Sequence, residues 1–141
     1  HTFDVIHTNK IEISASGGTN FGNDSTDTHI FTGSVSIISG GLRQHYYSLS
    51  ATSYTVNAYD SIIGVSNTSA VDITLPAAQT AGPGKILIIK DETNSTRSNP
   101  NRIAISGSGS QTIDNGATYD LSGDNPALTI YSNGVDKWFI Y

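Results

Sequence analysis

The sequence contains no cysteine and no methionine, and only 13% of its 141 residues are charged. Without cysteine the chain cannot use disulfides to support a thin core, as many small secreted domains do. The charged share is about half that of an ordinary globular protein, and the formal net charge is -5. Binding to DNA or RNA needs clustered basic side chains, whereas the seven Lys and Arg residues are scattered. We therefore expect no nucleic-acid partner.

Long apolar runs are also missing. No stretch approaches the roughly 20 residues of a membrane-spanning helix, and no basic segment followed by an apolar run suggests a signal peptide. We expect a soluble protein without membrane insertion. Small and turn-forming residues are abundant instead, with 19 Ser, 16 Thr, 14 Gly and 11 Asn. Residues of these types disfavour helix.

Apolar residues alternate with polar ones almost throughout, which is the period of a strand with one buried face. The alternating segments lie at 11–13, 35–37, 71–75, 103–105 and 128–130. The run Ile86–Ile89 is continuous, as expected of a strand buried on both faces. The pair Asn133-Gly134 predicts a hairpin that joins Leu128–Tyr131 to Trp138–Tyr141. No segment has helical spacing, so the pattern predicts an all-β fold.

The two ends of the chain differ in composition. Residues 1–45 contain short strand patterns between polar, Gly-rich stretches, and residues 46–141 are richer in Tyr, Ile, Leu and Val. We predict a shaft segment over 1–45 and a β-sandwich head over 46–141. Isolated strands with one apolar face are unstable in water, so we expect copies of the chain to cover one another in a homo-oligomer. A trimer is our first choice, although periodicity alone does not specify the number.

Two parts of the chain resemble known proteins. Residues 27–37 (DTHIFTGSVSI) are similar to the H-x-F-T-G-S-(V/L)-x-(I/V) repeat of bacteriophage tail-fibre and related viral fibre shafts. From Ser53 to Tyr141, the order of β-rich segments resembles the carboxy-terminal domain of many phage and virus fibre proteins. These segments are SYTV at 53–56, DSIIGV at 60–65, VDITLPAA at 71–78, GKILIIKD at 84–91, IAIS at 103–106, TID at 112–114, LTIYSNG at 128–134 and WFI at 138–140.

The resemblance implies a fold, a function and a location. It implies a short intertwined trimeric β-shaft followed by a β-sandwich head. The protein would be the homotrimeric tip of a virion fibre, exposed and extracellular, attaching the particle to a host-surface glycan or protein receptor. Whether it is a tail fibre or a capsid fibre stays open. The alternative is a carbohydrate-binding module of a secreted protein, which would be a monomer with an exposed aromatic platform.

An enzyme is the third hypothesis, and the sequence offers little for it. Gly82-Pro83-Gly84-Lys85 is followed by Ile86 and a strand, whereas a phosphate loop needs Ser or Thr and a helix. No G-x-S-x-G elbow occurs. Most carboxylates occupy predicted turns, which Asp favours, so the facing pair of a glycosidase is unsupported. We predict no catalytic residue.

The histidines give no metal motif. None of His1, His7, His29 and His45 forms an H-x-H or H-x-x-x-H pair. Three copies of one histidine could still meet on an oligomer axis and bind an ion. We predict no metal site and no cofactor within the single chain.

The aromatic residues and polar loops supply the receptor-binding candidates. We expect Trp138 and Tyr131 to pack, because both lie in strong strand patterns. Tyr59 and Tyr119 lie near turns and are candidate receptor contacts, since Tyr offers an apolar face with a polar tip. Loops near 66–69, 91–101 and 122–126 are expected to be exposed, and 91–101 also mobile. The remaining candidates from the first two loops are Asn67, Asn94 and Arg97.

Overall fold

The computed structural model describes residues 21–24, 27–38 and 40–141, and the chain divides into two compact units, His1–Ser36 and Ile37–Tyr141. The described residues of the first unit are exposed and form neither helix nor strand. The predicted strand pattern at 11–13, with His1 and His7, lies outside the described residues. The strand predicted at 35–37 is wrong for the single chain, because no neighbouring strand pairs with it among the described residues. The shaft boundary at residue 45 stays a prediction.

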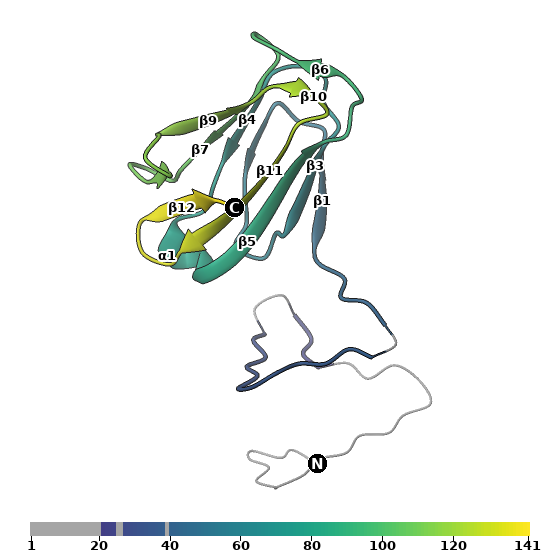
Figure 1. Ribbon diagram of the computed structural model, residues 1–141, viewed down its shortest axis with the longest axis vertical. Coiled ribbons are helices and arrows are strands. Elements are labelled where there is room, and N and C mark those ends of the chain that lie inside the picture. The colour runs from purple at the N-terminus through teal and green to yellow at the C-terminus, as the bar shows by residue number, and fades with distance from the viewer. Residues whose placement is uncertain (1–20, 25–26, 39) are drawn as a thin grey trace, which may run out of the picture. The chain divides into compact units, whose positions relative to one another are not determined.

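The second unit is all-β, as predicted, and consists of two sheets packed face to face (Figure 1). The six-stranded sheet contains, in spatial order, β1 (Tyr46–Leu49), β3 (Ile62–Val65), β5 (Pro83–Asp91), β11 (Ala127–Asn133), β12 (Lys137–Ile140) and β8 (Thr112–Ile113). The four-stranded sheet contains β2 (Ser53–Thr55), β4 (Val71–Thr74), β7 (Ile103–Ser106) and β9 (Thr118–Leu121). A small ribbon pairs β6 (Thr96–Arg97) with β10 (Gly123–Asp124), and one short helix, α1, spans Ala78–Ala81.

The chain winds around the core by alternating between the two sheets. The strands β1, β3 and β5 pair in parallel in one sheet, and β2, β4 and β7 pair in parallel in the other. Parallel neighbours cannot be joined by a tight hairpin, and here the connection between them passes through the opposite sheet. The later strands β9, β11 and β12 add antiparallel pairs.

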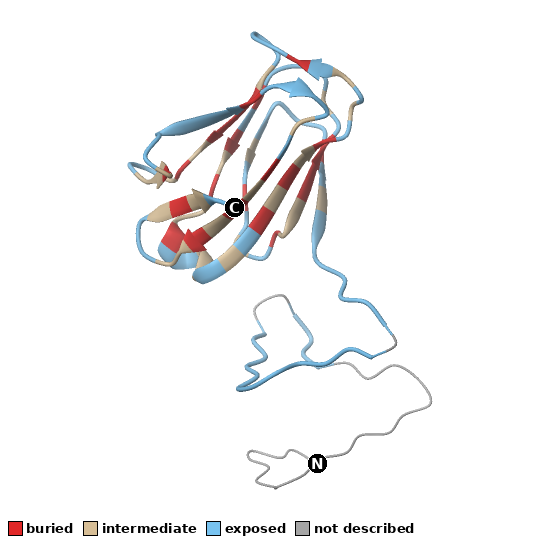
Figure 2. Ribbon diagram, viewed as in Figure 1, coloured by how far each residue is buried: buried red, intermediate tan, exposed pale blue. Residues whose placement is uncertain are grey.

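The core lies between the sheets and is built by the predicted alternation (Figure 2). Buried apolar side chains come from the inward positions of both sheets, among them Ile63, Ile73, Leu87, Ile105, Ile130 and Trp138. Trp138 is fully buried, which confirms its predicted packing role. On the four-stranded sheet, most of the outward side chains are polar and face water.

The run Ile86–Ile89 differs from the expectation. Leu87 and Ile89 are buried, but the side chain of Ile86 is 49% exposed and Ile88 is only partly buried. In the single chain, β5 is therefore covered on one face only. The prediction that both of its faces are buried is wrong for the single chain.

The predicted closing hairpin is confirmed. β11 and β12 pair antiparallel, with Ser132 opposite Trp138. The side chain of Asn133 stabilises the turn, because its Oδ1 accepts hydrogen bonds from the backbone N–H groups of Val135, Asp136 and Lys137 at 2.9–3.0 Å. Gly134 has a φ of 73°, a conformation that glycine adopts at little cost.

Candidate functional site

The parallel winding gathers the connecting loops at one end of the sandwich. The strands β1, β3 and β5 run in the same direction, so their carboxyl ends lie side by side. The antiparallel pairing of β9 with β7, and of β11 with β5, brings the segment between β9 and β11 to the same place. We call this region the loop end, and it comprises residues 50–52, 66–70, 92–102 and 122–126. The chain enters β1 at the opposite end, next to His45.

Arg97 holds the loop end together from inside. Its side chain is 1% exposed, and its Nε and Nη2 groups donate to the two carboxylate oxygens of Asp91, at 2.7 and 2.9 Å. Nη1 donates to the carbonyls of Ser69, at 2.9 Å, and Asn101, at 3.3 Å, and Nη2 also donates to the carbonyl of Asn67. A guanidinium has five N–H donors, and all five have an acceptor here.

Asp91 is the matching acceptor at the end of β5. Its Oδ1 also accepts hydrogen bonds from the backbone N–H and the hydroxyl of Thr93, at 3.1 and 2.8 Å. Burial would raise the pKa of the Asp91 carboxyl, but the hydrogen bonds from Arg97 and Thr93 outweigh it, so its pKa lies below the ordinary value. The Asp91 carboxylate is therefore ionised near neutral pH, and its pair with Arg97 fixes the two loops that follow β3 and β5.

The third loop is tied to the second by the β6–β10 ribbon. Thr96 pairs with Asp124 and Arg97 with Gly123 through the backbone, and the hydroxyl of Thr96 donates to the carboxylate of Asp124. The ammonium of Lys90 donates to the carbonyl of Asn125. The loops at 66–69, 91–101 and 122–126, marked from the sequence, are thus brought together into one surface.

The structure corrects the expectation for the loop at 91–101. Arg97 and Asp91 are buried, and the segment contains the strand β6, so it is not the fully exposed loop that its composition predicts. The polarity of the segment reflects an internal ion pair as well as its contact with water. Arg97 has no donor left for a receptor, because all of them bind within the head.

The candidates Asn67 and Asn94 lie on the loop end. Asn67 is half-buried, and its side chain is used internally: Nδ2 donates to the carbonyl of Ser50 and Oδ1 accepts from the N–H of Ser69, both at 2.8 Å. Asn94 is exposed, with a φ of 56° that marks a tight turn. Asn94 is therefore the freer of the two for an external contact.

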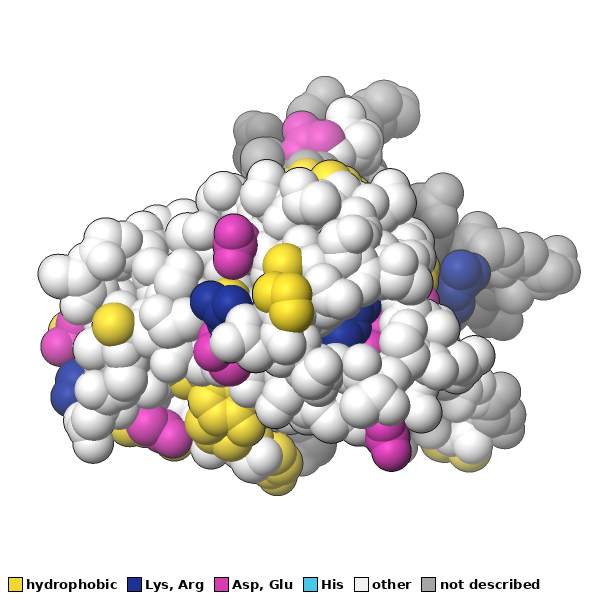
Figure 3. All heavy atoms as spheres, turned by 90° about the horizontal axis from the view of Figure 1, so that it is seen from above, with side chains coloured by type: hydrophobic (Ala, Val, Ile, Leu, Met, Phe, Trp, Pro, Cys, Tyr) yellow, Lys and Arg dark blue, Asp and Glu magenta, His cyan; other side chains and the backbone are white. Residues whose placement is uncertain are grey.

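Tyr119 lines a shallow pocket beside these loops. It is 37% exposed, and the pocket of about 320 Å³ is completed by Asp120, Leu121, Ser122, Pro126 and Ala127. Tyr119 lies opposite Ile105 in the pairing of β9 with β7, on the inward side of an edge strand. The residues that line the pocket thus include an aromatic side chain, a hydroxyl and the carboxylate of Asp120. Seen from the loop end, the surface is mostly uncharged, with isolated acidic and basic side chains (Figure 3).

Tyr59 lies at the other end of the sandwich. Its ring is 49% exposed and packs edge-to-face against His45, with centroids 5.1 Å apart. The structure therefore separates the two tyrosine candidates: Tyr119 lies beside the loop end, and Tyr59 lies where the chain enters the head.

Sequence reasoning missed the buried carboxylate of Asp60 at this entry end. Its Oδ2 accepts hydrogen bonds from the hydroxyl of Tyr54, at 2.7 Å, and the N–H of Asn57, at 2.9 Å. The Nδ1 of His45 lies 3.0 Å from Oδ1, without hydrogen-bond alignment. Burial and the bond to Asp60 raise the pKa of Tyr54 to about 12. The sequence indicates a turn at Asp60, but turn propensity carries no signal for burial.

Two further observations bear on the function class. In the described parts of the chain, no three potential metal ligands of the His, Cys, Asp or Glu type come together. No helix there is long and apolar enough to cross a membrane. Comparison with known proteins adds no assignment, because no family model matches the sequence and no curated protein matches it significantly.

Proposed function

We propose that this chain is the outer end of a homotrimeric viral fibre and that its head attaches the particle to a receptor on the host-cell surface. The observation that carries the proposal is that the head has two distinct ends. The loops meet at the end opposite the one where the chain enters, at His45. A head that continues from a stalk presents this far end to its target. Loops on a rigid scaffold are the usual place for binding residues.

The segment before the head supports the oligomeric part of the proposal. Its large apolar side chains are open to solvent: Ile30 is 85% exposed, Phe31 72%, Ile38 92% and Leu42 76%. Large apolar side chains left exposed within one short segment of the chain favour a partner that covers them. In a shaft of several chains, each copy covers the apolar side chains of the others, and the resemblance to fibre shafts favours three.

A glycan is the receptor class that the loop end suits best. Sugars bind through aromatic stacking and hydrogen bonds to polar groups, and the pocket at Tyr119 is lined by this tyrosine together with Asp120 and Ser122. Such contacts are individually weak, but several heads on one fibre multiply them through effective concentration. We assign no catalytic step to this surface.

The test combines mass and binding. Size-exclusion chromatography with light scattering on the full chain should give three times the monomer mass, and a glycan array should give specific signals. Tyr119→Ala should lose at least tenfold in apparent affinity, whereas Tyr59→Ala, a matched change at the entry end, should keep it. A monomer, or equal binding by both variants, would contradict the proposal. Shortened products after incubation with host polysaccharide would instead indicate an enzyme.

The Tyr119 pocket also favours the alternative of a carbohydrate-binding module of a secreted protein. The two functions share the sugar-binding chemistry and differ in assembly. A stable monomer that binds glycans through Tyr119 would favour the module, and a trimer would favour the fibre tip.

A further inference from the structure

The two sheets of the head differ in the faces that they turn outward. On the four-stranded sheet, the outward positions form two rows across the strands, which are polar except for the buried Ala104. The first row contains Ser53, Asp72, Ala104 and Asp120, and the second contains Thr55, Thr74, Ser106 and Thr118. This is the ordinary surface of a sheet with one buried face, and water covers it.

The outer face of the six-stranded sheet carries two neighbouring apolar rows, beside a row that contains Ser48, Gly64 and Lys90. The pairing places Tyr46, Ile62 and Ile88 in one row, since Tyr46 lies opposite Ile62 and Ile62 opposite Ile88. A second row contains Ile86, Tyr131 and Phe139. We call these six residues the apolar face. The rings of Tyr131 and Phe139 stack on each other with centroids 5.5 Å apart. Tyr131, which is predicted to pack, therefore packs against a neighbouring side chain on this outer face.

The apolar face is open to solvent in the single chain. Tyr46 and Ile86 are each 49% exposed, and the other four residues are partly buried by their neighbours. A continuous apolar run is typical of a strand buried on both faces, and Ile86–Ile89 is such a run. The core covers only the side of Leu87 and Ile89. The sequence of β5 therefore matches a state in which its second face is covered as well.

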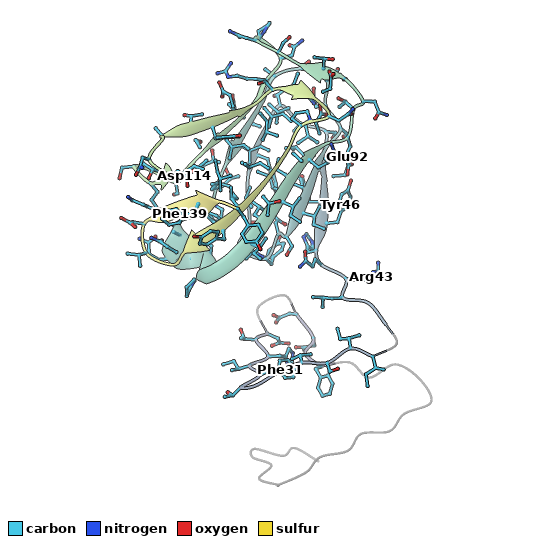
Figure 4. All side chains as sticks on the ribbon, in the orientation of Figure 1. Phe31, Arg43, Tyr46, Glu92, Asp114 and Phe139 are labelled. Atoms are coloured by element: carbon cyan, nitrogen blue, oxygen red, sulfur yellow. The ribbon has the colours of Figure 1, made fainter. Side chains whose placement is uncertain are left out.

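Charged groups of both signs lie next to this face. Lys90 follows Ile88 on the same side of β5, and the carboxyl group of Glu92 lies over Gly64 of β3. The hydroxyl of Tyr46 donates to Oε2 of Glu92 at 2.7 Å, and Figure 4 shows these two side chains together at the β1 edge, with Phe139 on β12. An apolar centre with a charged rim of mixed sign is the usual arrangement of a protein–protein interface.

The position of the face in the chain indicates the partner. β1 is an edge strand of this sheet, and Tyr46 begins it. The residues that lead into β1 belong to the same compact unit, and Ile37, Ile38 and Leu42 among them are 51%, 92% and 76% exposed. The exposed apolar surface therefore continues along the chain from the lead-in to the sheet. Other copies of the chain already cover the lead-in in the proposed fibre, so they are also the nearest partners for the face.

We propose that the apolar face of the six-stranded sheet is the surface through which the head packs against the head of a second copy of this chain. The proposal rests on the oligomeric fibre and adds the surface that the heads use. It assigns the polar face of the four-stranded sheet to the outside of the assembly. Ile86 lies near the centre of the contact, and Lys90 and Glu92 lie at its rim.

The absence of cysteine makes a direct test possible, because each introduced cysteine is the only thiol of its chain. Ile86→Cys and Phe139→Cys place a thiol on the apolar face, and Thr55→Cys places one on an exposed strand position of the polar face. The full-length variants are treated with a short bis-maleimide at low micromolar concentration. We expect a dimer-sized product on a denaturing gel for Ile86→Cys and Phe139→Cys, at least fivefold more than for Thr55→Cys. As a control, light scattering measures the mass of each variant, and circular dichroism checks that it keeps its fold.

The possible outcomes separate the two proposals. Selective cross-linking at the apolar face supports the inference. A trimer that cross-links at none of the three positions, or equally at all three, overturns the inference and leaves the fibre standing. A monomer in light scattering overturns both. If one apolar-face variant fails to fold, the other gives the answer.

Discussion

The guanidinium of Arg97 and the carboxylate of Asp91 form a two-point ion pair inside the head, with N···O distances of 2.7 and 2.9 Å. Both side chains are shielded from solvent, at 1% and 0% exposure. The three remaining N–H groups of Arg97 bind carbonyls of residues 67, 69 and 101. One arginine thus links the end of β5 to two loops.

Removal of Arg97 should therefore destabilise the head strongly. Arg97→Ala leaves the carboxylate of Asp91 buried without its counter-charge, and breaking a buried pair in this way costs about 3–5 kcal/mol. The free energy of unfolding from urea titration measures the loss. Arg102→Ala is the matched control, because the pair of Arg102 with Asp120 is 40% and 50% exposed and should contribute about 1 kcal/mol or less. Equal losses for the two variants would contradict this account.

The same ion pair should make the stability of the head depend on pH in the acidic range. The pKa of Asp91 is lower in the folded state than its ordinary value of about 3.9. Its contribution is therefore fully present above that ordinary value and is lost as the pH falls through the folded-state pKa. Asp91→Asn should be less stable than the original chain at pH 7, and the difference should shrink as the pH falls below about 4. Chemical unfolding across this range tests it, and a difference that does not change with pH would contradict it.

The hydroxyl of Tyr54 should ionise at a higher pH than an ordinary tyrosine. Its pKa is raised to about 12, compared with an ordinary value of about 10. The stability that it contributes is present below pH 10 and is lost as the pH rises through the folded-state pKa. In an ultraviolet titration of the folded chain, Tyr54→Phe should remove one tyrosine from the late part of the transition. Tyr59→Phe is the control, and loss of the late ionisation in that variant would refute the assignment.

The closing hairpin should tolerate no side chain at Gly134. A Cβ there would lie 2.6 Å from the backbone nitrogen of Pro83, and the φ of 73° also disfavours other residues. Gly109 has a φ of 59° but open space around it, so Gly109→Ala carries only the conformational cost of about 1–2 kcal/mol. Gly134→Ala should lower the melting temperature clearly further than Gly109→Ala. Similar melting temperatures would show that the contact with Pro83 relaxes.

Local patterns were sufficient for most of the strands and for the hairpin. Val71, Ile73 and Leu75 alternate with polar residues, and the structure buries all three. The turn at Asn133-Gly134 could be predicted because its chemistry lies within a few adjacent residues. The order of the strands could not, since the pairing of Tyr46 with Ile62 and of Ile62 with Ile88 depends on the packing of the whole head.

The charged residues show why the candidate site was harder to predict. Arg97 and Asp91 lie in a polar segment, and composition cannot separate a solvated charge from a buried pair. The three loops could be identified by their polarity, but their meeting follows from the parallel winding. Asp60 is hidden in the same way, because its partners Tyr54 and Asn57 become visible only in the folded chain.

Because the chain alternates between the two sheets, the length of a connection does not determine how the strands that it joins are paired. Between β1 and β3 the chain makes its circuit from Tyr46 to Ile62, and between β3 and β5 it makes a longer one from Ile62 to Ile88, yet both pairs stay in straight register. The additional residues of the longer connection lie outside the paired segments of β3 and β5. A head built in this way can lengthen one connection without changing the pairing of the strands that it joins.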